Sequence, residues 1–335
     1  MASTGKARGA AKAPQRANGG HAVLIGLSAA VVSVAEERPR VLVVHRAGSP
    51  DALPFGTFDP LSHRTLESGL RDWVEEQTHL RLGYVEQLYT FGDRGRHLTH
   101  PGEGPRVLSV GYLALTRTQE KHGPETMWRD WYGYFPWEDW RDKKPAIIDS
   151  LIIPRLKIFA DKASSAEFCE RLHDRIRLCF GSQGSGWDEE KVLERYELLY
   201  EAGLVSEAQR DRQSAPAGGP LPVLGASMVF DHRRILATAM GRLRGKMKYR
   251  PVVFELMPPE FTLLELLRTV EALSGVRLHK QNFRRLIEAQ GLVEGTGHLS
   301  RKAGGRPAEQ FRFRREVVRE RPAPGVRLTP TRTPR

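Results

Sequence analysis

Three carboxylates stand at a spacing that could hold a metal ion. Asp72, Glu75 and Glu76 occupy positions i, i+3 and i+4 of a helix expected over residues 64–77, so one helix face carries all three. Oxygen ligands of this kind suit hard divalent cations such as Mg²⁺, whereas without a cation the clustered charges must be solvated or neutralised. The pattern therefore fits a metal site, and it also fits a solvated, purely structural helix face.

Basic and amide side chains form a second group near the C-terminus. In a helix expected over residues 280–290, Phe283, Leu286 and Ile287 face the core, which leaves polar residues of the N-terminal half exposed. A basic glycine loop follows at residues 300–307. The polar residues of this helix and loop are Lys280, Gln281, Asn282, Arg284, Arg285, Arg301, Lys302 and Arg306. Such residues contact bases from a helix and phosphates from a loop, so double-stranded DNA is the expected partner.

The segments around this basic group predict a winged helix-turn-helix. A first helix should start near residue 262 and end near residue 275. Its signals are a capping box, a hydrophobic staple and a terminating glycine, namely Thr262 with Glu265, Phe261 with Leu266, and Gly275. Residues 292–294 and 311–314 fit two strands, and the basic loop between them is the wing. The same architecture can instead bind only protein, in which case salt-dependent DNA affinity would be absent.

The net charge is concentrated in the same region. Residues 242–335 contain 21 Lys and Arg, 9 Glu and no Asp, and this excess of 12 positive charges equals the net charge of the whole chain. The first 241 residues are therefore electrically balanced. A basic excess confined to one domain is the electrostatic footprint of a nucleic-acid partner, although a solvated arginine-rich tail would give a similar count.

Length and composition indicate an ordinary soluble protein of two or three domains. The 335 residues are 40% hydrophobic, which permits proper cores. The two cysteines, Cys169 and Cys179, have neither C-x-x-C nor zinc-site spacing, so we expect two buried thiols rather than a disulfide framework or a zinc site. Neither a signal peptide nor an apolar run of membrane-spanning length occurs, which predicts a cytoplasmic protein.

The first 240 residues predict a mixed α/β domain. Residues 21–34 and 40–46 fit paired strands around a charged turn, and residues 151–212 fit a helical insert. Asp231 precedes an apolar-faced helix, so we expect an N-cap rather than a catalytic partner of His232. That helix leads into the winged helix and could relay a signal to it. The aromatic cluster at residues 128–140 should pack in a core or interface, with stacking on an adenine as the alternative.

The acidic helix carries the run Arg71-Asp72-Trp73-Val74-Glu75-Glu76. This run resembles the R-E-U-x-E-E core of a Nudix box, with Asp in place of the first Glu. His63 stands where the box has an earlier glutamate, and residues 77–80 lack its glycine. The resemblance implies that the three carboxylates hold Mg²⁺ around a pyrophosphate, while the histidine should lower the metal affinity. Hydrolysis, weak non-catalytic binding of a metal-nucleotide and a structural role are the three readings left open.

A longer run of family-like residues occupies the C-terminal third. It comprises Phe230-Asp231-His232-Arg233-Arg234-Ile235-Leu236, Leu243-Arg244-Gly245-Lys246, Tyr249-Arg250-Pro251, Phe261-Thr262-Leu263, Asn282-Phe283-Arg284-Arg285 and Gly305-Arg306-Pro307-Ala308. Together with the acidic helix, this run resembles the Nudix-related transcriptional regulators of bacterial NAD metabolism, the NrtR and NadQ type. The family commonly has an acidic cap at the start of the recognition helix, where this chain has His279.

The resemblance implies an α/β (α+β) Nudix-like sandwich with a helical insert, followed by a winged helix-turn-helix. We expect disordered basic tails at residues 1–20 and 319–335, a nucleotide-sensing domain at 21–250 and the winged helix at 251–318. The implied function is that of a bacterial repressor of NAD biosynthesis or salvage genes, nucleoid-associated when DNA-bound. It would be a homodimer on a palindromic operator and would sense ADP-ribose, NAD or ATP, with no required cofactor beyond Mg²⁺ accompanying the nucleotide. The competing reading is a Mg²⁺-dependent Nudix hydrolase of a nucleoside diphosphate derivative with an appended DNA-binding domain.

Overall fold

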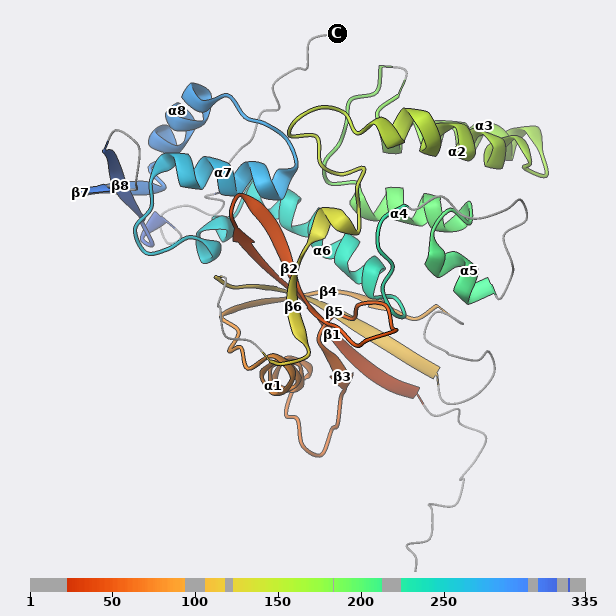
Figure 1. Cartoon of the computed structure of the whole chain (residues 1–335), viewed down its shortest axis with the longest axis horizontal. Coiled ribbons are helices and arrows are strands. Elements are labelled where there is room, and N and C mark those ends of the chain that lie inside the picture. Colours follow the sequence, from red (N-terminus) through yellow and green to blue (C-terminus); the bar gives the residue numbers. More distant parts are fainter. Residues whose placement is uncertain are drawn as a thin grey trace, which may run out of the picture.

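A mixed six-stranded sheet forms the centre of the protein (Figure 1). The computed structural model describes residues 23–93, 106–117, 123–182, 184–212, 224–300, 307–317 and 325. The strands of the sheet are β1 Val23–Ala35, β2 Arg38–Val44, β3 Phe55–Thr57, β4 Tyr84–Phe91, β5 Arg106–Leu115 and β6 Thr126–Asp130. They follow the order β4-β5-β1-β2-β6, and β3 pairs with β1 outside this path. β1 and β5 run parallel, whereas the other described pairings are antiparallel.

The predicted pair of N-terminal strands is confirmed as the hairpin β1–β2. Ala35 pairs with Arg38, so the turn consists of Glu36 and Glu37 alone. Both residues have a left-handed φ, 52° and 58°, as a two-residue turn of type I′ requires. Because the turn is this tight, β2 begins two residues before the expected start at residue 40.

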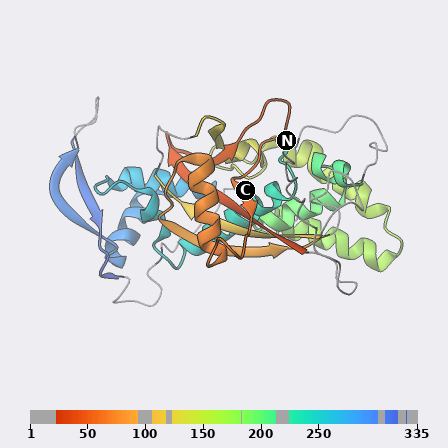
Figure 2. The ribbon, with the colours of Figure 1, turned by 90° about the horizontal axis from the view of Figure 1, so that it is seen from below.

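Helices cover both faces of the sheet. α1 (Leu66–Thr78) packs through Leu70 and Val74 on one face, the face turned toward the viewer in Figure 2. α6 (His232–Met247) crosses the other face and buries Ile235 and Leu236 in a larger core shared with the insert. This arrangement is the predicted α/β sandwich. Asp231 occupies the N-cap position of α6 as predicted, but within the described chain its side chain forms no capping hydrogen bond. The helix continues two residues past the expected end at Gly245.

The predicted helical insert is confirmed. Its helices are α2 Ile153–Asp161, preceded by a π-helical turn at Ile148–Ile152, then α3 Ala166–Phe180, α4 Val192–Glu201 and α5 Ser206–Arg212. The aromatic cluster joins the insert to the core, because Trp131, Phe135 and Trp137 are fully buried. Core packing is thus the observed role of these rings. Cys179 is buried as predicted, but the prediction was wrong for Cys169, which lies half-buried on the outer part of α3.

The C-terminal part forms two helices and a β-hairpin. Its elements are the 3₁₀ turn Val252–Leu256, α7 Leu263–Ser274, α8 Lys280–Gln290, β7 Val293–Ser300 and β8 Ala308–Phe313. The capping box is confirmed, since Thr262 Oγ1 accepts from the Glu265 amide at 3.2 Å and Glu265 Oε2 accepts from the Thr262 amide at 2.8 Å. Gly275, with φ 75°, ends α7 as predicted. β7 runs on to Ser300, beyond the expected residues 292–294, because the ladder is interrupted rather than ended between Gly295 and Leu299.

None of the described helices combines the length and the apolar character that crossing a membrane requires.

Candidate functional site

The exposed surface of α8 presents the predicted DNA-contacting side chains. Phe283 and Ile287 are buried and hold the helix against the core. The side chains that remain exposed are Lys280, Gln281, Asn282, Arg284 and Arg285. Arg284 Nε donates a 2.8 Å hydrogen bond to Glu288 Oε1, and this bond raises the pKa of Arg284. Glu288 therefore orients the guanidinium of Arg284. The other basic side chains of this surface face solvent and are accessible to a ligand.

The start of α8 is electropositive. His279 occupies the N-cap position, and within the described chain its side chain forms no capping hydrogen bond. The first turn contains no acidic residue and begins with Lys280. Unsatisfied amides and the helix dipole attract phosphate at such an end. The absence of the acidic cap therefore strengthens the positive potential of this surface.

The β7–β8 hairpin projects from one end of the molecule (Figure 2). Its base is fixed, because the Phe313 ring stacks on Phe254 at a centroid distance of 4.3 Å. Phe261 and Phe311 also exchange two backbone hydrogen bonds of 2.8 and 3.0 Å. The predicted phosphate-contacting residues of the wing lie outside the described residues; they are Arg301, Lys302 and Arg306. The anchored base holds this hairpin beside the start of α7.

The three carboxylates of α1 are exposed, and two of them have a basic side chain nearby. Arg81 Nε donates a 2.8 Å bond to Glu75 Oε1, and His63 Nε2 lies 3.9 Å from Asp72 Oδ2. Glu76 is exposed as well. Within the described residues, these carboxylates do not converge on a common metal position. The proposed metal ligands Asp72, Glu75 and Glu76 therefore share a helix, as predicted, without being gathered into a site.

Arg71, in the same helix, has a structural role. It forms an ion pair of 2.8 Å with Glu67, and its Nη2 donates to the carbonyl oxygen of Gly83 at 3.1 Å. A second donation reaches the carbonyl oxygen of Leu82. Arg71 thus ties α1 to the loop that precedes β4.

A pocket of about 180 Å³ opens between the end of β2 and the start of α6. Its lining residues are Val44, Arg46, Ser49, Pro50, Ala52, Phe55, Val229 and Phe230. Phe55 and Phe230 meet edge to face at a centroid distance of 6.0 Å, and Phe230 has a left-handed φ of 47°. Aromatic walls with one cation, Arg46, at the margin suit a planar ring that carries an anionic group.

The comparisons with known proteins concern first the C-terminal part. Residues 253–313 match the family model described as the NrtR DNA-binding winged helix domain. Residues 253–313 are therefore similar to the winged helix of the NrtR type. The matched residues run from the 3₁₀ turn through β8 and lie within residues 251–318, the range that the sequence predicts.

Two known proteins are similar to the chain over different lengths. The ADPR responsive transcriptional repressor NtrR of Acinetobacter baylyi is 42% identical over 90 residues, which are 27% of this chain and 36% of that protein. The match thus spans about a third of the relative's length. The crystal structure of Shewanella oneidensis NrtR is 19% identical with a TM-score of 0.52, and the match covers 88% of this chain and 96% of that one. This second likeness shows the fold alone, an α/β domain followed by a winged helix.

A buried cluster of charges joins the NrtR-type winged helix to the rest of the protein. Glu138 accepts bonds of 2.6 and 2.9 Å from Arg195 and one of 2.7 Å from Arg244, and all three side chains are wholly inaccessible. Arg244 Nε, in the last turn of α6, donates to the carbonyl oxygen of Leu273 at 2.9 Å. Burial opposes the charge of Arg244, yet Tyr132 and Glu138 raise its pKa above the ordinary value. The guanidinium therefore stays charged at the carboxyl end of α7.

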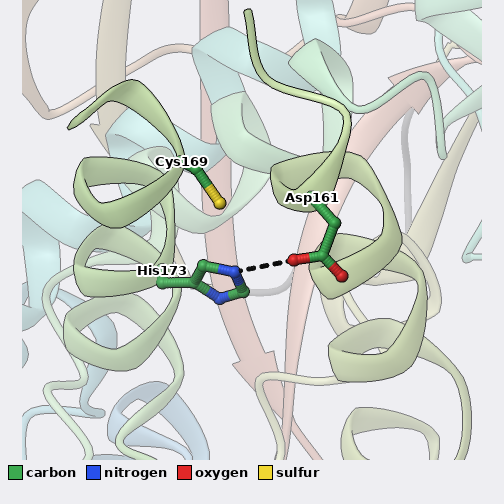
Figure 3. Close-up of side chains that lie close together, drawn as sticks. All are labelled: Asp161, Cys169 and His173. Atoms are coloured by element: carbon green, nitrogen blue, oxygen red, sulfur yellow. Dashed lines mark hydrogen bonds and ion pairs between the residues drawn. The ribbon is translucent and has the colours of Figure 1, made fainter. Parts of the chain in front are cut away.

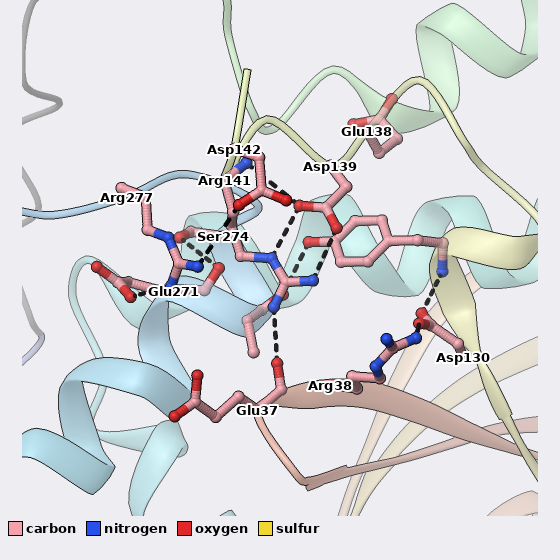
Figure 4. Close-up of polar contacts among 12 residues, drawn as sticks. Glu37, Arg38, Asp130, Glu138, Asp139, Arg141, Asp142, Glu271, Ser274 and Arg277 are labelled. Atoms are coloured by element: carbon pink, nitrogen blue, oxygen red, sulfur yellow. Dashed lines mark hydrogen bonds and ion pairs between the residues drawn. The ribbon is translucent and has the colours of Figure 1, made fainter. Parts of the chain in front are cut away.

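Further bonds reach the same end of α7. Tyr132 Oη donates to the carbonyl oxygen of Ala272, and the Trp140 amide donates to that of Gly275, each at 2.7 Å. Figure 4 shows the neighbouring contacts at the surface, where Arg141 reaches the Glu37 carbonyl at 2.6 Å and Arg277 lies beside Glu271. The orphan carbonyls of a helix end need such partners. The winged helix is thus held by donors from the α/β domain.

Sequence reasoning missed Glu138, Arg195 and Arg244 as a set. Glu138 lies 57 positions before Arg195 and 106 positions before Arg244. Their shared burial arises only when α4, α6 and residues 130–142 pack together. In the sequence, Arg244 stands out only as a member of the family-like run.

Proposed function

We propose that this protein is a DNA-binding transcriptional repressor that responds to an adenine nucleotide, with ADP-ribose as the first candidate. The observation that carries the proposal is the exposed basic and amide surface at the start of α8, in a winged helix of the NrtR type. The excess of 12 positive charges in residues 242–335 supports a polyanionic partner. The name of the Acinetobacter relative, an ADPR responsive repressor, supports the choice of effector.

In this proposal α8 enters the major groove. Gln281 and Asn282 read base edges, while Arg284 and Arg285 contact bases or flanking phosphates. The wing binds phosphates through Arg301, Lys302 and Arg306. A homodimer would place two such helices on a palindromic operator, with half-sites about one helical turn or a multiple apart. The proposed targets are genes of NAD biosynthesis or salvage.

The pocket lined by Phe55 and Phe230 is the proposed effector site. Its aromatic walls suit an adenine or a ribose, and Arg46 suits a phosphate at the margin. Phe230 directly precedes Asp231, the N-cap of α6, and Arg244 in the last turn of α6 binds the end of α7. We infer that α6 links occupancy of the pocket to the winged helix. A rigid helix that contacts the ligand site at one end and another domain at its other end can couple ligand binding to that domain.

The acidic helix supports a regulator better than a hydrolase. Arg81 already pairs with Glu75, so a metal at Glu75 would have to displace this guanidinium. Within the described residues, the three carboxylates also do not converge on one position. We therefore propose that the protein is not an efficient enzyme, that it requires no cofactor, and that Mg²⁺ enters only with the nucleotide. The cytoplasm, where the operator is located, is the proposed compartment. The alternative function is that of a Mg²⁺-dependent Nudix hydrolase. Turnover of ADP-ribose by the wild type that Glu76→Gln abolishes would be evidence for it.

A mobility-shift assay tests the proposal. The purified chain is incubated with DNA from upstream of its own gene, with promoter DNA of NAD-biosynthetic genes and with random DNA, each with and without ADP-ribose, NAD or ATP. We expect a sequence-specific shift that one nucleotide changes. No shift at low salt would overturn the proposal, and a shift without any effect of the three nucleotides would remove its sensing half.

A further inference from the structure

The hairpin of α2 and α3 brings an aspartate, a cysteine and a histidine together (Figure 3). Asp161 is the last residue of α2, whereas Cys169 and His173 stand at positions i and i+4 of α3 and therefore share a face. His173 Nε2 and Asp161 Oδ1 are 3.0 Å apart. One carboxylate oxygen, the Cys169 Sγ and one imidazole nitrogen all lie within 4.8 Å of one another. Figure 3 shows the three side chains pointing into the space between the two helices.

This geometry is close to that of a tetrahedral metal centre. With Zn–S about 2.3 Å and Zn–N or Zn–O about 2.0 Å, the ligand atoms of a tetrahedral Zn²⁺ lie roughly 3.3 to 3.6 Å from one another. The nitrogen and oxygen atoms are already slightly closer than that, at 3.0 Å. The sulfur lies within 4.8 Å of them, so a rotation of its side chain could bring it to bonding distance. A thiolate, an imidazole and a carboxylate together select a borderline cation over Mg²⁺ or Ca²⁺.

The backbone around the three side chains is fixed, while their present contacts are weak. Leu172 and Ile176 on α3 are buried, and Ser165 caps the helix by accepting a hydrogen bond from the Phe168 amide at 3.2 Å. The side chains of Asp161 and His173 are 65% and 40% exposed. An exposed pair of this kind contributes little to stability, so a metal can readily replace it. Among the described residues, the Cys169 thiol has no hydrogen-bond partner that metal binding would have to displace.

We propose that Asp161, Cys169 and His173 form a binding site for Zn²⁺ or a similar borderline divalent transition metal. The three ligands leave a fourth position for water or for a ligand from another molecule. Binding requires the thiolate of Cys169 and releases its proton to solvent. The site is distinct from the acidic helix and from the aromatic pocket. Cysteine spacing in the sequence predicts no zinc site, because it indicates only sites that are built from several cysteines. Here two of the three ligands are not cysteines, and Asp161 comes from a different helix.

Cobalt(II) titration of the untagged, metal-free full-length chain tests this site. Co²⁺ is the probe because a cobalt–thiolate bond gives a charge-transfer absorption band. We expect one equivalent of Co²⁺ per chain, with this band, and displacement by Zn²⁺. Cys169→Ser should abolish the band, and His173→Gln and Asp161→Asn should weaken binding by roughly tenfold or more, since even residues outside the ligand set can cost that much. Saturating Zn²⁺ should raise the Tm of the wild type and leave that of Cys169→Ser unchanged.

Two variants serve as matched controls. Cys179→Ala removes the other thiol, which is buried, and Asp174→Asn removes a carboxylate of the same helix that pairs with Arg177. Both should keep the band and the stoichiometry, with circular dichroism confirming that each variant is folded. The proposal is overturned if the wild type binds no cobalt at micromolar free metal, if the band persists in Cys169→Ser, or if folded Cys179→Ala loses it.

Discussion

Arg244 Nη1 donates a 2.7 Å hydrogen bond to Glu138 Oε2, and the two residues are 106 positions apart. Arg195 binds the same carboxylate, so the buried cluster contains two guanidinium groups and one carboxylate. The carbonyl oxygen of Leu273, at the end of α7, accepts from Arg244 Nε, where the helix dipole is negative. The three charged side chains all belong to the α/β domain, and this hydrogen bond links their cluster to the winged helix.

Replacing Glu138 with Gln should destabilise the protein strongly. The change leaves Arg195 and Arg244 without their counter-charge in a fully buried position. Breaking a buried ion pair by removing one partner typically costs about 3–5 kcal/mol. Urea unfolding of the full-length variant measures the loss.

The matched control for this change is Glu167→Gln. Glu167 pairs with Arg171 on the surface of α3, and both side chains are well exposed. Such pairs contribute about 0.2–1 kcal/mol. If Glu138→Gln costs no more than this control, the buried cluster does not contribute the stability expected of it.

Gln281→Ala should relax sequence specificity without abolishing DNA binding. Gln281 is exposed in the first turn of α8, where a base-reading side chain would stand. Loss of one bidentate base contact costs about 1–3 kcal/mol at one operator position and almost nothing on random DNA. Competition binding with operators substituted at single positions measures the effect. Equal losses on operator and random DNA would contradict the assigned role.

Arg301→Ala should act in the opposite manner. A phosphate contact from the wing carries no sequence information, so affinity should fall to a similar degree on every DNA. The slope of log affinity against log salt should become shallower by about one unit. Fluorescence anisotropy at several salt concentrations measures both quantities. A loss confined to the operator would show that Arg301 reads bases instead.

Phe55→Ala should weaken nucleotide binding while preserving DNA binding in the absence of effector. Phe55 forms a wall of the pocket and meets Phe230 edge to face. Calorimetric titration with ADP-ribose measures the affinity, and the mobility shift measures DNA binding. Tyr89→Ala is the control, because this ring is 62% exposed on β4 and is not among the residues that line the pocket. Unchanged nucleotide affinity in Phe55→Ala would place the effector elsewhere.

Asp139 should contribute stability at neutral pH that is lost in acid. Burial alone would raise its pKa, but the hydrogen bonds and charge of Arg141 outweigh burial and hold the pKa below the ordinary 3.8. A depressed folded-state pKa means that the contribution is full above 3.8 and disappears as the pH falls through the folded-state value. Wild type should therefore lose more stability than Asp139→Asn between about pH 6 and pH 3 in urea unfolding. Parallel losses in both proteins would exclude this role for the Asp139–Arg141 pair.

Local signals in the sequence were sufficient for most elements of the winged helix. Thr262 with Glu265 and Gly275 set the ends of α7 because capping depends on residues within one turn. The bounds of α8, and the exposure of Lys280 and Arg285, followed from helical periodicity for the same reason. The hairpin was predicted less well, since the length of β7 depends on its pairing with β8 and on the irregularity near Gly297.

The acidic helix illustrates the limit of local pattern. The sequence placed Asp72, Glu75 and Glu76 on one helix face, which periodicity determines. Only the fold placed Arg81 beside Glu75 and His63 near Asp72, because these partners come from the loops that flank α1. Such neighbouring basic side chains decide whether the carboxylates bind a metal ion together or pair with charges of the protein.

The family resemblance implied the α/β sandwich. The residue patterns themselves determined the elements of the winged helix, the first two strands and the basic character of the second part. These properties arise from periodicity, capping and composition, which act over a few residues or add up along the chain. Only the tertiary structure decided that Glu138 meets Arg195 and Arg244, and that Asp161 meets Cys169 and His173. Contacts between helices depend on how whole faces pack together, and no short stretch of sequence encodes that packing.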